Sequence, residues 1–252
     1  MDRVDLNCDL GEGAGADDEI LSYVTSANIA CGFHAGGPSI MRRTVRAALQ
    51  HRVAIGAHPG LPDRENFGRV PQAISPDDAF DMVVYQVGAL DGFVRALGAD
   101  ATMVHVKPHG ALYNMAAADA GLADAIARAV RAVNPALVLI GLSGSELIGA
   151  GARAGLATAN EVFADRSYQP DGTLTPRGRP GALLTDVALV VRQAMDLVRT
   201  QHVLATDGTN VAVRADTICL HGDGARAVEF ARAIRSELAA AGIAIAPLAR
   251  QR

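Results

Sequence analysis

The sequence lacks tryptophan, and only 4% of its 252 residues are aromatic. Few flat side chains are therefore available to stack on nucleic-acid bases. Runs of basic residues are also missing and the net charge is −4, which argues against nucleic acid as a partner. No apolar run reaches about 18 residues, so we expect no membrane-spanning helix. What remains is a chain that is half apolar and a fifth charged, as is usual for a globular protein with a large core.

Cysteine is scarce as well. Cys8, Cys31 and Cys219 are an odd number, and no two of them have CxxC spacing. All three lie in apolar, strand-like runs, where small buried core residues are expected. A disulfide scaffold or a zinc finger is therefore not predicted. The first ten residues, MDRVDLNCDL, carry no apolar region of the signal-peptide type, so we expect a cytoplasmic protein.

Lysine is the rarest charged residue, since Lys107 is the only one among 23 basic side chains. It lies in the stretch VHVKPHGALYN, between His105 and His109. A lone lysine is usually a solvated surface residue, but this one falls in a strand-like run. A compact ammonium binds a carboxylate or phosphate as a point charge, or loses its proton when desolvated, whereas a guanidinium stays charged and needs more room. We therefore interpret Lys107 as a confined functional cation.

Short strand-type runs alternate with longer helical runs along the chain. Such repeated βα units predict a parallel sheet, here within one domain spanning residues 1–252. The predicted strands span residues 4–10, 26–33, 53–59, 102–109, 137–143, 157–163 and 217–223. The predicted helices lie near residues 39–51, 76–97, 119–132, 145–153, 185–201 and 224–241.

Two further segments do not fit the βα pattern. Residues 164–182 form a stretch too long for an ordinary connection, so we predict a functional lid or binding loop. Residues 202–216 are predicted to form a β-hairpin, because Asp207 and Gly208 make a favourable turn between two β-type runs.

Polar and apolar side chains alternate along three of the predicted strands. The polar members are Asp5, Asn7 and Asp9 in the first strand, His105, Lys107 and His109 in the fourth, and Cys219, His221 and Asp223 in the last. Successive side chains point to opposite faces of a strand, so each strand has one polar face. An open parallel sheet covered by helices on both faces would be apolar throughout. The pattern favours a closed α/β barrel of the TIM-like (β/α) type, with its active site at the C-terminal ends of the strands.

Histidines and acids gather where the predicted strands end. They are His34, His58, His109 and His221, together with Asp9, Glu12, Glu161, Asp165 and Asp223. Because catalytic residues on a barrel come from the ends of several strands, we predict that these residues share one site. They would supply a general base and a general acid at neutral pH. A divalent metal held by Asp9, His34 and His58 is the weaker hypothesis, because no HExxH or HxH motif supports it.

Glycines also crowd the strand ends, in the segments DLGEGAG, CGFHAGG, GAHPG, KPHGA and HGDG. Glycine lets the backbone approach a ligand closely, and several of these turns precede helices, whose N-termini attract anions. No GxxxxGK[ST] sequence is present, so a Walker-type ATP site is not predicted.

Six segments resemble the LamB/YcsF family, whose members form the A subunit of the bacterial ATP-dependent 5-oxoprolinase. The segments are VDLNCDLGEG, VTSANIACGFHAG, VAIGAHPGLPDRENFGR, VHVKPHGALYN, EVFADRSYQPDGTLTPR and RADTICLHGD, between residues 4 and 223. The resemblance implies a seven-stranded barrel of the glycoside hydrolase and deacetylase type. The chain departs from the family pattern at Gly37, where the family usually has an acid, and after Glu12, where its segment is shorter.

The resemblance also implies a reaction, in which 5-oxo-L-proline, ATP and water give L-glutamate, ADP and phosphate with the help of partner subunits B and C. Phosphorylation of the lactam oxygen would make the ring carbon electrophilic, and an activated water would attack it. We expect Asp9 or His58 to act as the base, with Lys107 and His109 stabilising the developing anion. The remaining expected roles are orientation or proton transfer for Glu161, His221 and Asp223, and substrate binding for Asn7, Glu12, His34 and Arg166.

Two other functions remain open at this point. A metal-dependent N-deacylase on the same barrel would bind a divalent metal among Asp9, His34 and His58. A non-catalytic subunit would bind a carboxylated metabolite and deliver it to a partner. The sequence does not determine whether ATP contacts this chain or whether the chain forms a homo-oligomer.

Overall fold

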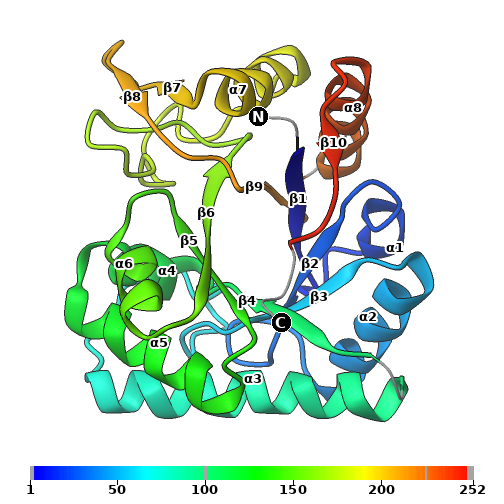
Figure 1. Ribbon diagram of the computed structural model, residues 1–252, viewed down its shortest axis with the longest axis vertical. Helices are drawn as coiled ribbons and strands as arrows, with labels where there is room; N and C mark the ends of the chain where they lie inside the picture. The colour runs from blue at the N-terminus through cyan, green and yellow to red at the C-terminus, as the bar shows by residue number, and fades with distance from the viewer. Residues whose placement is uncertain (1–2, 99–100, 225, 249–252) are drawn as a thin grey trace.

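Seven parallel strands close into a barrel in the computed structural model, which describes residues 3–98, 101–224 and 226–248 (Figure 1). The strands are β1 (Arg3–Leu10), β2 (Ser26–Ala30), β3 (Ala54–His58), β4 (Met103–Val106), β5 (Val138–Leu142), β6 (Ala157–Phe163) and β9 (Thr217–His221). Each strand pairs with the next in this order, and β9 pairs with β1 to close the barrel. The prediction of a seven-stranded TIM-like barrel is confirmed. A short strand, β10 (Ala244–Ile245), pairs with the start of β1.

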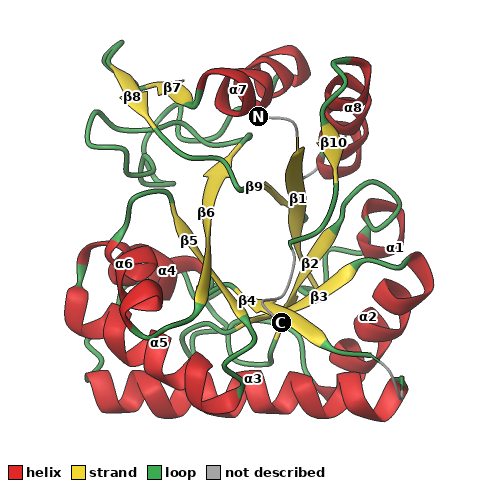
Figure 2. Ribbon diagram, in the orientation of Figure 1, coloured by secondary structure: helices red, strands yellow, loops and turns green. Residues whose placement is uncertain are grey.

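Helices surround the barrel on its outside (Figure 2). They are α1 (Asp17–Ile20), α2 (Pro38–His51), α3 (Pro76–Leu97), α4 (Gly110–Ala118), α5 (Ala120–Val133), α6 (Glu146–Arg153), α7 (Val187–Thr200) and α8 (Ala227–Ala240). The predicted helices correspond to α2, α3, α5, α6, α7 and α8. Ala225, inside the last predicted range, lies outside the described residues.

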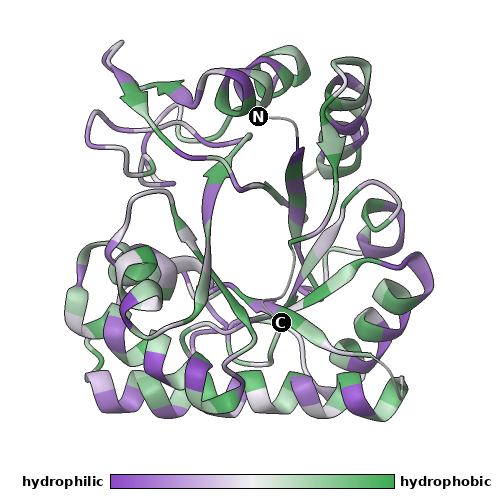
Figure 3. Cartoon of the chain, viewed as in Figure 1, coloured by the Kyte–Doolittle hydropathy of each residue, from purple (hydrophilic) through white to green (hydrophobic). Residues whose placement is uncertain are grey.

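The longest helix, α3, illustrates how the sequence directs this packing. The Ser75 hydroxyl accepts a hydrogen bond from the Asp78 N–H, and Pro76 occupies the first turn, so the helix begins there. Its buried residues, among them Val83, Val87, Leu90 and Val94, recur at three- and four-residue spacing and form one apolar stripe. The helix packs against α5. Figure 3 shows green and purple patches alternating along the outer helices, as this one-sided burial requires.

The strand predicted at residues 102–109 is shorter in the structure, because β4 ends at Val106. Beyond that point the backbone leaves the ladder with β5 but continues beside β3. The Lys107 N–H donates to the Ala57 carbonyl at 2.9 Å, and the His109 N–H donates to the Pro59 carbonyl at 2.8 Å. The alternation of polar and apolar residues continues beyond the end of the strand, and the predicted strand was therefore too long. Helix α4, which was not predicted, follows directly and has no side-chain cap at its start.

The interior of the barrel is polar. Thr217 donates to Asp5 at 2.6 Å, and Asn7 donates to Thr217 at 2.6 Å and to Glu161 at 3.0 Å. Asn28 donates to Asn7 at 2.7 Å. Buried polar groups are costly unless they are hydrogen-bonded, and these contacts satisfy most of them, with Glu161 Oε2 as an exception. The polar strand faces predicted from the alternation therefore do point inward.

One interior histidine depends on a neighbouring glycine. The His105 Nε2 N–H donates to the Asn28 side-chain oxygen at 2.7 Å. A Cβ at Gly56 would lie 2.0 Å from that same nitrogen, so only glycine leaves room for the imidazole. Burial, followed by the charges of Lys107 and His58, lowers the pKa of His105 to about 3. The ring is therefore neutral at physiological pH.

We expect this neutral histidine to make the fold acid-sensitive. The ordinary histidine pKa is about 6.5, so below that pH the unfolded chain binds a proton that folded His105 excludes until about pH 3. Its contribution to stability is fully present above about pH 6.5 and is lost as pH falls, at up to about 1.4 kcal/mol per pH unit. Urea unfolding at pH 7 and pH 5 should therefore differ by about 2 kcal/mol from this residue alone. His105→Gln, which keeps a donor for Asn28, should reduce the difference, and an unchanged difference would contradict the assignment.

The two irregular segments lie beside the barrel. β7 (His202–Leu204) and β8 (Asn210–Ala212) pair in antiparallel fashion. In the 164–182 segment, Tyr168 forms isolated bridges with Leu174 and Ala205, and its hydroxyl accepts a hydrogen bond from the Phe163 N–H at 2.7 Å. This segment is therefore anchored to the end of β6. Among the described residues, no helix has the length and apolar character needed to span a bilayer.

Candidate active site

A cavity of about 580 Å³ opens at the C-terminal ends of the barrel strands. Its charged and polar lining residues include Asp9, His58, Arg69, Lys107, His109, Asn114, Arg166, Arg177 and His221, and its apolar ones include Leu142, Phe163 and Leu174. This volume and mixed lining are typical of small-molecule sites. A smaller cavity of about 270 Å³ lies at the other end of the barrel, around Asp216 and Leu248.

Lys107 lies at the base of the larger cavity, where three acceptors converge on its ammonium group. Its Nζ is 2.9 Å from Asp9 Oδ1, 2.9 Å from Glu161 Oε1 and 2.9 Å from Cys219 Sγ. The ammonium donates hydrogen bonds to Asp9 and Cys219 and forms an ion pair with Glu161. A planar guanidinium would spread its donors over a wider fork. This arrangement gives a physical reason for the single lysine of the chain.

The ammonium of Lys107 stays charged in this environment. Burial lowers its pKa, but Asp9, Cys219 and Glu161 outweigh burial and hold the pKa well above its usual value. The sequence had left open a lysine that loses its proton on desolvation, and the surrounding acceptors oppose that alternative. Lys107 is therefore a permanent positive charge between two carboxylates.

Asp9 links Lys107 to the histidines. Its Oδ1 accepts from Lys107 and, at 2.8 Å, from Asn28, while its Oδ2 lies 3.3 Å from His58 Nε2. Burial alone would raise the pKa of Asp9, but the charges of His58 and Lys107 hold it well below its usual range. The carboxylate is therefore ionised at neutral pH, with one oxygen directed to the histidine side of the site.

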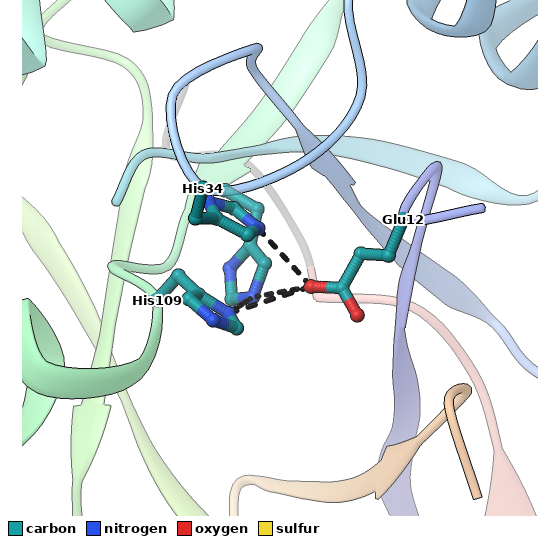
Figure 4. A group of neighbouring side chains, drawn as sticks. Glu12, His34 and His109 are labelled. Carbon is teal, nitrogen blue, oxygen red and sulfur yellow. Dashed lines mark hydrogen bonds and ion pairs between the residues drawn. The ribbon is translucent and has the colours of Figure 1, made fainter. Parts of the chain in front are cut away.

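Glu12 and three histidines meet beside Asp9. Figure 4 shows Glu12, His34 and His109 turned toward one another. Glu12 Oε1 lies 3.1 Å from His34 Nε2, 3.4 Å from His109 Nδ1 and 3.9 Å from His58 Nε2. Each of the four side chains offers one possible metal-ligand atom. These atoms all lie within 4.8 Å of one another, so the group could hold a metal ion. Of the predicted metal residues, His34 and His58 belong to this group, while Asp9 belongs to a second one with Cys219 and His221.

Two histidines of this group, His34 and His109, are neutral. Burial, followed by the charge of His58, lowers the pKa of His34 to about 2. The same two causes, in the same order, hold the pKa of His109 well below its usual value. The rings of His34 and His109 stack in parallel with centroids 3.7 Å apart. Burial and then the charge of Asp9 raise the pKa of Glu12 well above its usual value.

His221 forms a dyad with Asp165 on the other side of the cavity. His221 Nδ1 lies 3.0 and 2.9 Å from the two Asp165 carboxylate oxygens. Burial raises the pKa of Asp165, but the His221 charge and hydrogen bonds outweigh it and keep that pKa low. A carboxylate only accepts, so Nδ1 carries a proton and Nε2 is free to exchange one in the cavity. The sequence reasoning named Asp165 among the strand-end acids but assigned it no role.

The other predicted site residues lie at the rim or below the cavity. Asp223 accepts from Arg69 at 2.6 Å at the rim. The guanidinium of Arg166 lines the cavity and also donates to the Ala182 and Thr175 carbonyls, at 3.2 and 2.6 Å. Asn7 is fully buried in the barrel, where it holds Glu161.

Sequence reasoning missed Arg177, which lines the cavity from the 164–182 segment. Burial, and then the charge of Arg69, lowers the pKa of Arg177. Within the described residues it forms no ion pair, although the charges of Asp223, Asp165 and Asp9 favour its charged form. The unusual length of its loop was the only signal available, because an arginine in a loop is otherwise unremarkable in a chain with 23 basic residues.

A closed parallel barrel with an enclosed, highly charged cavity at its C-terminal mouth defines a (β/α)-barrel protein with a small-molecule site of the enzyme type. The comparison with protein families specifies this further. The model of the LamB/YcsF family matches residues 4–252, and the chain belongs to this family.

Known relatives are similar to this chain over nearly their whole length. A protein from Bacillus subtilis (strain 168), named as the A subunit of 5-oxoprolinase, is 58% identical, over 100% of this chain and 99% of its own. One of the same name from Methylococcus capsulatus is 57% identical, over 97% of this chain and 95% of its own. The crystal structure of a lactam utilization protein from Thermus thermophilus is 45% identical, covers 98% of this chain and 100% of its own, and superimposes with a TM-score of 0.90.

Proposed function

We propose that this chain is the A subunit of an ATP-dependent 5-oxoprolinase, in which it binds 5-oxo-L-proline and opens the lactam ring to give L-glutamate. The observation that carries the proposal is the enclosed cavity in which Asp9, Lys107, His221 and Arg177 converge. The names of the relatives support a lactam substrate over a metal-dependent deacylase or a metabolite carrier. The proposal includes partner subunits B and C, ATP as the co-substrate of the complex, and a cytoplasmic location.

The cavity suits a small lactam that carries a carboxylate. Arg177 supplies a guanidinium that forms no ion pair within the described residues, and it would bind the substrate carboxylate through charge-assisted hydrogen bonds. Leu142, Phe163 and Leu174 supply an apolar wall for the ring methylenes. The lactam carbonyl would then face the Lys107 and Asp9 side of the cavity.

Ring opening needs activation, because the amide is stabilised by resonance. In the proposed sequence, the γ-phosphoryl group of ATP is transferred within the complex to the lactam oxygen. A water attacks the ring carbon and loses a proton to Asp9. The C–N bond then breaks, His221 Nε2 protonates the nitrogen, and an acyl phosphate remains. A second water releases phosphate and leaves the carboxylate of glutamate.

The other charged residues support these steps. Lys107 stabilises the negative charge that develops beside Asp9, and His109 lines the same wall of the cavity. Glu161 and Asp223 act through the cations that they contact, Lys107 and Arg69. Asp165 orients His221. Asp9 is chosen over His58 as the base because its second oxygen stays ionised and accepts no hydrogen bond from Lys107 or Asn28.

Arg177→Ala should raise the KM for 5-oxoproline about 10- to 100-fold with a smaller change in kcat, because a lost charge-assisted hydrogen bond is worth about 1.5–3 kcal/mol. Steady-state kinetics of the reconstituted complex measure this. Arg179→Ala, at an exposed position of the same loop, is the matched control and should leave KM unchanged. Equal effects of the two substitutions would rule out Arg177 as the carboxylate anchor.

The proposed function is tested by reconstituting the chain with subunits B and C and measuring glutamate release. Glutamate should form only when this chain, both partners, ATP and 5-oxoproline are all present, and phosphate should appear in equal amount. Binding of 5-oxoproline without turnover in the complete mixture would instead identify a carrier subunit. Glutamate formation without this chain would overturn the proposal.

A further inference from the structure

The histidines beside Asp9 are held in fixed tautomers by backbone carbonyls. His58 Nδ1 lies 2.7 Å from the Lys107 carbonyl oxygen, and His109 Nε2 lies 2.8 Å from the Phe67 carbonyl oxygen. A carbonyl only accepts, so both of these nitrogens carry hydrogen. A metal-bound imidazole is neutral, and in that state the opposite nitrogens, His58 Nε2 and His109 Nδ1, are the ones that present lone pairs.

These two nitrogens lie 2.9 Å apart. Glu12 Oε1 adds a third acceptor, 3.4 Å from His109 Nδ1 and 3.9 Å from His58 Nε2. Three possible ligand atoms thus meet in one buried place. The nearby ammonium of Lys107 is already occupied by Asp9, Glu161 and Cys219. A divalent cation placed between these three atoms would contact all of them.

The fourth member of the group, His34, has a different role. Its ring is parallel to that of His109, with a 5° angle between planes and 3.7 Å between centroids. A lone pair lies in the plane of its ring, so stacked rings cannot both aim at the same point. His34 Nε2 instead lies 3.1 Å from Glu12 Oε1, and it donates to that oxygen when Glu12 is ionised, as a metal-bound carboxylate is. His34 Nδ1 has no hydrogen-bond partner among the described residues.

The loop around the group is shaped to hold these rings. Phe67 has a φ of +57°, an uncommon conformation for a residue with a large side chain, and its carbonyl is the acceptor for His109. A Cβ at Gly60 would lie 2.5 Å from His34 Nδ1, and one at Gly68 would lie 2.7 Å from His34 Cβ. The backbone therefore approaches the imidazoles closely and sets their orientation.

We propose that Glu12, His58 and His109 bind one divalent transition-metal ion of the zinc class, with His34 as a positioning residue that orients Glu12. Two imidazoles and one carboxylate are a ligand set that suits zinc, and leave a fourth position open. With metal–ligand bonds of about 2.0–2.1 Å, tetrahedral ligands lie about 3.3 Å apart, and the observed separations of 2.9, 3.4 and 3.9 Å surround that value. Backbone acceptors on the far nitrogens are the usual outer contacts of metal-bound histidines.

The open position faces the cavity, since His58 and His109 both line it. A zinc-class ion there would polarise a bound oxygen or lower the pKa of a bound water. The site itself is independent of the proposed lactam chemistry, because it follows from the geometry of the side chains alone. Metal binding is therefore measured without substrate, ATP or partner subunits, so that its failure and the failure of the proposed function are distinguishable.

The full-length chain is stripped with a chelator and titrated with Zn²⁺ by calorimetry and with Co²⁺ by visible absorption. One equivalent should bind, and Co²⁺ should show the intense bands of a four-coordinate site. Glu12→Gln, His58→Ala and His109→Ala should each weaken binding by about 100-fold or more, since even outer contacts are worth about 10- to 100-fold. His34→Gln keeps a donor for Glu12 and should bind nearly as well as the unmodified chain, while His34→Leu should lose about 10-fold.

His202→Ala, at a half-buried hairpin histidine outside the cavity, is the control and should bind like the unmodified chain. Circular dichroism identifies any variant that fails to fold. Glu12→Gln is expected to disturb folding least, because glutamine is nearly isosteric with glutamate. A folded, unmodified chain that binds no Zn²⁺ or Co²⁺ would overturn the proposal. Binding that persists undiminished in the folded Glu12, His58 and His109 variants would overturn it as well.

Discussion

Lys107→Met is expected to abolish glutamate formation by the reconstituted complex and to lower the free energy of unfolding by about 3–5 kcal/mol. The substitution leaves Asp9 and Glu161 buried within 2.9 Å of where their shared cation had been. An uncompensated buried charge is strongly destabilising, and the anion that forms during ring opening loses its nearest positive group. Urea unfolding and steady-state kinetics measure the two effects separately.

Two companion variants separate charge from shape. Lys107→Arg keeps the charge but replaces a point donor by a wide fork, so it should also lose most of the activity. Lys107→Met combined with Glu161→Gln removes one of the stranded carboxylates, and should recover part of the stability without recovering turnover. Full activity in Lys107→Met, or in Lys107→Arg, would refute the role assigned to this lysine.

Asp9→Asn is expected to lower kcat by about 10³-fold while KM for 5-oxoproline changes little. General-base catalysis contributes about 10²- to 10⁴-fold, and an amide cannot accept the proton of the attacking water. The amide oxygen can still accept from Lys107, so the fold should survive, as circular dichroism would show. Because the pKa of Asp9 is held well below its usual range, the base stays ionised and its protonation should not limit kcat until well below pH 4.

The matched control is Asp207→Asn, at an exposed turn where asparagine before glycine is equally favourable. It should leave kcat and KM unchanged. If the kcat of Asp9→Asn stays within a few-fold of the unmodified value, another group acts as the base.

The amino-acid sequence by itself determined the class of fold and which faces of the strands are polar. Side-chain direction alternates with every residue in a strand, so the pattern of Asp5, Asn7 and Asp9 was enough to predict a polar face. Composition alone singled out Lys107, and the position of His34, His58 and His109 after strand-type runs was enough to place them at one end of a barrel. These inferences succeed because they depend on local periodicity and chain order.

Only the tertiary structure decided which of these residues touch. Lys107 contacts Glu161 and Cys219 because β6 and β9 are neighbouring strands. In their register, Glu161 pairs with Thr217 and Phe163 pairs with Cys219. That register is set by closure of the whole barrel, and a shift by one residue would turn the other side-chain face inward. Likewise, the tautomers of His58 and His109 depend on two backbone carbonyls, one of them on a loop.

The electrostatic environment of each site residue also depends on the tertiary structure. Arg177 sits in an irregular segment with no periodicity to interpret, and its importance comes from the cavity that it lines. Asp9 and Glu12 are only three residues apart, yet the pKa of the first is lowered and that of the second is raised. Residue type and spacing cannot distinguish them, because the difference depends on which charges lie nearby after folding. The sequence therefore specified which residue types are present at the site, and packing across the barrel determined which of them contact one another.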